Sequence, residues 1–245
     1  MELRWMLLGL AACGRLDFVP REDAGAGIVA IASAVGTNGA GAPTVSTPPQ
    51  TYAAGDLLVA MVHDGDSSVN VTAVTDSAGN AFTFAPNSRL QIVGQGIQTV
   101  EIWYAHDIAS SLDDIVTATL SGSSSSARIV VREYRGADPV APFDVAATGS
   151  MLGTTTVTSD SFTTSTAGNV TLAFGVPQDT GMVVKGTGTW TAGAGYTLRD
   201  HEPTRDLQCE ERFDTPSGAQ TASLTYSQPG NMIISVASFK ASGAF

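Results

Sequence analysis

The chain has 245 residues and a formal net charge of −11, with only 12 Lys and Arg residues against 23 Asp and Glu residues. So acidic a composition excludes a nucleic-acid-binding protein, because too few cations are present to neutralise a row of phosphates. The chain is also poor in Lys and rich in Thr and Val, which favours strands over helices.

The first thirteen residues have the pattern of an export signal. A short apolar run, residues 5–10, leads into the small residues Ala11 and Ala12 and then Cys13. The run is far shorter than the about 20 apolar residues that span a membrane, so it predicts a removable signal peptide over residues 1–12. The alternative is a buried amphipathic N-terminus with an incidental cysteine.

The segment Leu10-Ala11-Ala12-Cys13 resembles the lipobox of bacterial lipoproteins, in which the signal is cleaved before the cysteine and the thiol is acylated. The resemblance implies a lipid anchor on Cys13 and a membrane as its partner. In bacterial lipoproteins, a residue other than Asp directly after the lipidated cysteine, here Gly14, points to the outer rather than the inner membrane. The expected location is therefore the bacterial cell envelope, as an outer-membrane lipoprotein or a secreted protein. Residues 13–27 are polar and without periodicity, which predicts a flexible tether.

The body, residues 28–241, is predicted to be all-β. Short apolar runs recur between turn residues, and no window shows the 3.6-residue stripe of an amphipathic helix. The predicted strands are Val29–Val35, Leu57–His63, Val71–Thr75, Ala81–Ala85, Thr99–His106, Ile115–Leu120 and Arg128–Arg135.

The body also repeats itself, in pseudo-repeats of about residues 28–136 and 143–241. Leu57, Val59 and Met61 match three residues of a later strand, Val170, Leu172 and Phe174. The run 129–135 matches the run 234–240, so that Tyr134 corresponds to Phe239. Several matches in the same order are difficult to obtain by chance, although any two amphipathic strands share some likeness.

Two architectures fit this repeat. Both units can share one core as halves of a jelly-roll-like double-sheet sandwich, or they can form two tandem immunoglobulin-like sandwiches. The join between them, residues 135–144, is short and carries the apolar Val140 and Phe143. This favours a crossover packed on a shared core, and hence one β-sandwich domain over residues 28–241.

No catalytic motif is present, and we expect a protein that is not an enzyme. The chain has no nucleophile elbow and no paired-histidine zinc motif. Cys209 is placed between acidic neighbours that would raise its pKa, and lipidation of Cys13 would leave it without a disulfide partner. A glycoside hydrolase is the less favoured reading, with its carboxylates drawn from Glu101, Glu133, Glu210 and Glu211 on strands.

No cofactor is expected, apart from the option of calcium. The segment 63–67 places Asp64 and Asp66 close together, and carboxylate oxygens are ligands that calcium prefers. The alternative, that these are ordinary turn aspartates, is favoured because the segment matches no calcium-binding loop.

Sugar binding is the first functional hypothesis. Glycan sites use exposed aromatic rings with polar groups beside them. Along Thr99–Ala105 the alternation turns Val100, Ile102 and Tyr104 inward, which leaves Trp103 outward. Trp190 and Tyr196 lie in a Gly-rich stretch that could present their rings to solvent, and Arg199 follows closely. The alternative is that these aromatics are ordinary packing residues.

The body resembles the repetitive jelly-roll or carbohydrate-binding-like modules of secreted bacterial proteins, although no motif identifies one module. Its pseudo-repeats of short strands carry that resemblance, which implies a surface-anchored, non-catalytic binding module for glycans. The second hypothesis is a structural or adhesive cell-surface protein that binds a protein partner at an exposed sheet edge.

Overall fold

The structure, a computed structural model, describes most of the predicted body. The described residues are 27–38, 41–65, 69–92, 98–177, 187–203 and 207–243. The signal peptide 1–12, Cys13, the tether up to residue 26, and Asp66 lie outside them. Across these ranges the chain is all-β, and none of its segments is a helix with the length and apolar character of a membrane span.

Eleven strands lie in the described residues of the first unit, and they include every strand predicted from the sequence. Its large antiparallel sheet has the order β1-β11-β4-β8-β6, with β7 also on β8, and its smaller sheets have the orders β2-β10-β5 and β3-β9. The strands are β1 (Val29–Thr37), β2 (Ala42–Ser46), β3 (Gln50–Tyr52), β4 (Leu57–Asp64), β5 (Val71–Asp76), β6 (Thr83–Phe84), β7 (Leu90–Ile92), β8 (Gln98–Ala105), β9 (Ser111–Asp114), β10 (Val116–Ser124) and β11 (Arg128–Arg135).

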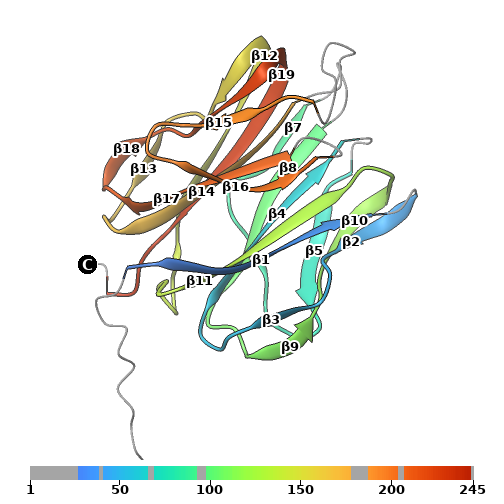
Figure 1. The fold of residues 1–245 in the computed structure, drawn as a ribbon. Helices are drawn as coiled ribbons and strands as arrows, with labels where there is room; N and C mark the ends of the chain where they lie inside the picture. Colours follow the sequence, from blue (N-terminus) through green and yellow to red (C-terminus); the bar gives the residue numbers. More distant parts are fainter. Residues whose placement is uncertain are drawn as a thin grey trace, which may run out of the picture.

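The second unit is built on a large sheet of the order β12-β19-β14-β17-β16, in which β15 also pairs with β19 (Figure 1). A short sheet joins β13 to β18. The strands are β12 (Phe143–Thr158), β13 (Phe162–Thr164), β14 (Asn169–Pro177), β15 (Trp190–Ala192), β16 (Thr197–Glu202), β17 (Leu207–Thr215), β18 (Gly218–Gln220) and β19 (Ser223–Phe239).

The two units follow one pairing scheme. In the first, Leu57 of β4 pairs with Tyr134 of β11, and in the second, Val170 of β14 pairs with Phe239 of β19. The long strand β12 takes the places of β1 and β2, and β19 takes those of β10 and β11. The residues matched in the sequence therefore occupy equivalent positions in the two sheets.

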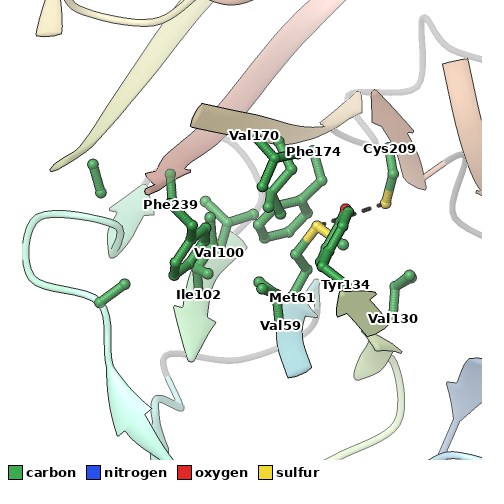
Figure 2. Close-up of a cluster of buried hydrophobic side chains, with 14 of the residues drawn as sticks. Val59, Met61, Val100, Ile102, Val130, Tyr134, Val170, Phe174, Cys209 and Phe239 are labelled. Carbon is green, nitrogen blue, oxygen red and sulfur yellow. Dashed lines mark hydrogen bonds between the residues drawn. The ribbon is translucent and has the colours of Figure 1, made fainter. Parts of the chain in front are cut away.

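The large sheets of the two units face each other across a central core. Figure 2 shows side chains from both units directed at one another, among them Met61 and Ile102 from the first and Phe174 and Phe239 from the second. Cys209 is also buried here, with its Sγ 3.8 Å from Sδ of Met61. Buried side chains of both large sheets therefore pack in one cluster between them.

Each large sheet also has a second buried face. In the first unit Leu58, Ala60 and Val62 of β4 pack in a separate core with Val45 and Val116 from the smaller sheet. The second unit has its own core, built on one face of β14 and β19 together with β15 and with Ala147 and Val157 of β12. Each unit is thus a two-layer sandwich in itself, and the units are more than halves of one double sheet.

The alternation along β8 follows the prediction, but its outer face is not open to solvent. Val100 and Ile102 enter the central core, whereas Trp103 and Ala105 point to the core of the first unit. The expectation of an exposed Trp103 is wrong in part, because a second layer covers this face and leaves the ring half-buried.

The join between the units contributes one of its two apolar residues to the core. Phe143 packs on Tyr104 and Phe239, at ring-centroid distances of 5.7 and 6.1 Å. Val140 is 78% exposed, so the expectation that it packs is wrong. Asp138 accepts hydrogen bonds from the backbone N–H groups of Val140 and Ala141, and the resulting turn directs the valine outward.

Two equivalent glycines mark the places where the chain turns from one layer to the other. A Cβ on Gly36 would lie 2.0 Å from the carbonyl oxygen of Ser46, and one on Gly149 would lie 2.1 Å from that of Thr158. Both obstacles are backbone atoms, so they cannot move aside as a flexible side chain could. Each unit therefore requires glycine at this position.

A buried ion cluster joins the two large sheets. Arg132 of β11 forms ion pairs with Asp200 of β16 and with Glu211 of β17, the latter at 3.1 Å between Nη2 and Oε2. The hydroxyl of Tyr134 donates a hydrogen bond to Glu211 and accepts one from Nε of Arg132, at 3.0 and 2.9 Å. The units are thus held by directional contacts as well as by the central core.

Candidate binding hollow

The aromatic residues of the Gly-rich stretch are buried. Trp190 and Tyr196 are each 9% exposed and belong to the core of the second unit, and Trp190 lies 4.8 Å from the ring of Tyr226. The expectation that the stretch presents both rings to solvent is wrong. Its glycines permit close packing instead, since a Cβ on Gly188 would lie 1.9 Å from the Tyr226 ring.

Trp103 lies at an aromatic edge of the first unit, far in the sequence from those residues. Its ring meets Phe84 edge-on at 5.6 Å, and its Nε1–H donates to Glu101 at 3.3 Å. Glu101 is itself buried and forms an ion pair with Arg89 at 2.7 Å. This edge is partly exposed, since the Trp103 side chain is half-buried.

Two further predicted site residues, Arg199 and Asp64, have structural partners. Arg199 pairs with Glu211 and so belongs to the ion cluster between the sheets. Asp64 is buried and accepts hydrogen bonds from Ser124 at 2.6 Å and Ser126 at 3.4 Å. In the part of the chain that the structure describes, no three His, Cys, Asp or Glu side chains are grouped to hold a metal ion.

A polar hollow of about 360 Å³ opens in the second unit. Its walls come from the residue before β13, the turn between β15 and β16, the strands β17 and β18, and the start of β19. The lining residues are Ser161, Ala194, Tyr196, Arg212, Ala219, Gln220, Thr221 and Ser223. Of the predicted site residues, Tyr196 alone lines this hollow.

The polar wall of the hollow is formed by Arg212 and Gln220. One guanidinium nitrogen, Nη1 of Arg212, donates to the amide oxygen of Gln220 at 3.4 Å. The turn opposite is built from glycines: Gly195 has a φ of +81°, and a Cβ on it would lie 3.3 Å from Nε of Arg212. This turn can approach the guanidinium closely because it carries no side chain there.

The buried carboxyl of Glu210 belongs to the same strand as Arg212, two residues earlier. Burial raises its pKa to about 7, although it accepts a hydrogen bond from the backbone N–H of Gly193 at 2.8 Å. Burial, and next the charge of Glu210, also raise the pKa of Tyr196, so its phenol remains a hydrogen-bond donor at neutral pH.

The first unit carries apolar residues at the equivalent positions. Phe84 pairs with Trp103 as Leu198 pairs with Glu210, so Trp103 is the counterpart of Glu210. Ala105 pairs with Leu58 as Arg212 pairs with Thr171, which makes Ala105 the counterpart of Arg212.

The aromatic position before these strands is also equivalent in the two units. Phe82 lies two residues before Phe84, and Tyr196 lies two residues before Leu198. The apolar set Phe82, Trp103 and Ala105 is thus replaced by Tyr196, Glu210 and Arg212.

Sequence reasoning missed Arg212 and Gln220, which follow no motif. Glu210 was considered only as a strand carboxylate. The strand register of the two sheets, and not the sequence alone, sets Arg212 against Ala105.

Comparison with known proteins gives no family for this chain. No protein-family model and no curated protein matches the sequence. Among solved structures, the chain is similar to the C-terminal domain of the AgI/II polypeptide BspA of Streptococcus agalactiae, at 9% identity. The match covers 86% of this chain and 91% of that one with a TM-score of 0.21, and at that score it carries no argument.

Proposed function

We propose that this protein is a non-catalytic binding module whose hollow in the second unit holds one sugar residue of a glycan. The volume of about 360 Å³ is within the range of small-molecule sites, about 300–1,000 Å³. Sugar hydroxyls require both donors and acceptors, which Arg212, Gln220 and the hydroxyls of Ser161, Thr221 and Ser223 supply. The ring of Tyr196 adds an apolar wall for a sugar face.

One observation carries this proposal: the polarity of the hollow compared with its counterpart. Both units bury this face of the sheet, and the first unit does so with a tryptophan and an alanine. Packing alone therefore does not require a glutamate and an arginine there. A change to groups that are costly to bury is expected where they contact a ligand.

The test is a glycan array probed with the full chain and with Gln220→Ala. Gln220 is only half-buried, so its loss should leave the melting temperature unchanged. Binding to the recognised glycan should fall at least tenfold, because the amide hydrogen bonds are lost. Gln91→Ala, an exposed glutamine of the first unit, is the matched control.

An unchanged profile for Gln220→Ala would contradict the proposal. A third variant, Trp103→Ala, separates the two places at which aromatic rings lie. Loss of binding in that variant alone would move the site to the edge formed by Trp103 and Phe84.

We further propose that each unit is a jelly-roll-like sandwich and that residues 28–241 act as one domain. The strands β1-β11-β4-β8 face the three-stranded sheet β2-β10-β5, and two facing antiparallel sheets are the architecture of a jelly roll. The central core and the ion cluster between the units support a single cooperative domain.

The anchor remains a proposal from the sequence. Cleavage after residue 12, acylation of Cys13 and a tether over residues 13–27 would display the module on the outer membrane. Metabolic labelling with a palmitate analogue should mark the full chain and should be lost in Cys13→Ser. Equal labelling of both proteins would contradict the anchor.

A further inference from the structure

Arg212 differs from the other arginines that the structure describes. Five of these form ion pairs with carboxylates; they are Arg89, Arg128, Arg132, Arg135 and Arg199. In the part of the chain that the structure describes, Arg212 has no ion pair, and its guanidinium donates a hydrogen bond to the neutral amide of Gln220. In a chain with 23 acidic residues, an arginine without a carboxylate partner stands out.

The neighbouring carboxyl does not supply the missing partner. Glu210 is turned to the backbone N–H of Gly193, and Arg212 is not among the groups that affect its pKa. The guanidinium and the carboxyl both influence the pKa of Tyr196, the carboxyl raising it and the guanidinium lowering it. Beyond its bond to Gln220, the Arg212 guanidinium therefore has N–H donors available to a ligand in the hollow.

The hollow is also shaped around this side chain. Gly195 leaves room beside Nε of Arg212, and Gly193 packs so closely that a Cβ on it would lie 2.5 Å from the carbonyl oxygen of Ser223. A guanidinium presents parallel N–H donors that match the two oxygens of a carboxylate or sulfate group. The equivalent alanine of the first unit, Ala105, has no such capacity.

We infer that the hollow selects a negatively charged sugar, with the carboxylate or sulfate group of that sugar paired to Arg212. This inference rests on the proposed function, because it names the class of glycan that the same hollow takes. Tyr196 and Gln220 would then contact the ring and hydroxyls of the sugar that carries the charge.

The experiment is calorimetric titration of the full chain with three oligosaccharides. A trimer of galacturonic acid carries carboxylates, its methyl ester is neutral, and a sulfated galactose oligomer carries sulfate. We expect binding of at least one acidic probe and at least tenfold weaker binding of the ester. The two acidic probes distinguish the carboxylate from the sulfate.

Arg212→Gln should weaken binding of the acidic probe at least tenfold while leaving the melting temperature unchanged. Lys240→Gln removes one positive charge outside the hollow and should have no effect, which controls for net charge. If Arg212→Gln fails to fold, Arg212→Lys takes its place; it should weaken binding several-fold, because an ammonium lacks the paired donors.

The outcomes separate the two proposals. If the ester binds as tightly as the acid, or Arg212→Gln binds like the unmodified chain, the charge selection is overturned while sugar binding in the hollow stands. If no glycan binds, acidic or neutral, both proposals fall.

Discussion

Replacement of Arg132 by methionine should lower the free energy of unfolding by about 3–5 kcal/mol, as expected when one partner of a buried ion pair is removed. In the variant the carboxylates of Asp200 and Glu211 lose the positive charge of Arg132. The loss is costly because the side chain of Glu211 is completely buried. Urea unfolding at pH 7, followed by tryptophan fluorescence, measures the loss. The unmodified chain should unfold in one transition, because the cluster and the central core join the units.

Arg199→Met is the matched control for this prediction. It removes a cation from the same carboxylate, but that cation is 37% exposed and should contribute only about 1 kcal/mol. Adding Glu211→Gln to Arg132→Met should recover part of the loss, since it removes the charge left behind. Equal effects of the two arginines would contradict the role assigned to Arg132, and two unfolding transitions would contradict a single domain.

The stability of the protein should fall as the pH rises from 5 to 8. Burial raises the pKa of Glu210 to about 7, from 4.5 for a free side chain. A group whose pKa is raised by folding contributes its full stability below the unfolded pKa and loses it as the pH passes the folded one. Each pKa unit corresponds to about 1.4 kcal/mol, so ionisation of Glu210 should remove up to about 3 kcal/mol.

Glu210→Gln tests this prediction because it fixes the side chain in a neutral form. Urea unfolding should find the variant about as stable as the unmodified chain at pH 5 and more stable at pH 8. Glu133→Gln is the companion variant. The pKa of Glu133 is also raised to about 7, first by burial and then by its hydrogen bond with the Asp56 carboxyl. If the pH dependence of Glu210→Gln equals that of the unmodified chain, the buried carboxyl is not its source.

The strands and the repeat could be predicted because both follow from the order of residues along the chain. The apolar run from Leu57 and the turn residues around it place β4 within one residue of its end. The match of Tyr134 with Phe239 needed only the order of residues along the chain. The pairings of Leu57 and Val170 place these two residues at equivalent positions.

Exposure could not be predicted in the same way. Whether the face with Trp103 meets solvent depends on β2, β5 and β10 folding over it, which alternation along one strand does not encode. The glycines before Trp190 and Tyr196 suggested a loose, exposed stretch. In the fold they permit contacts that any other residue would block.

The hollow was hidden for a related reason. Ser161, Arg212 and Thr221 come together only when the turns of the second unit close on β17. They share no spacing and no motif. What identifies them is a difference between two otherwise equivalent units, and that difference becomes readable once the strand register is known.

The single pairing scheme of the two units creates a hazard during folding, because β11 could insert where β19 belongs. Val59 pairs with Arg132 as Leu172 pairs with Ala237, so the exchange would place the Arg132 guanidinium at the buried position of Ala237. Glu133 would likewise replace the buried Ser238. Two charged side chains would then stand where an alanine and a serine are fully buried, which would destabilise the exchanged chain, so the divergence of the repeats protects each newly made molecule from assembling its own halves wrongly.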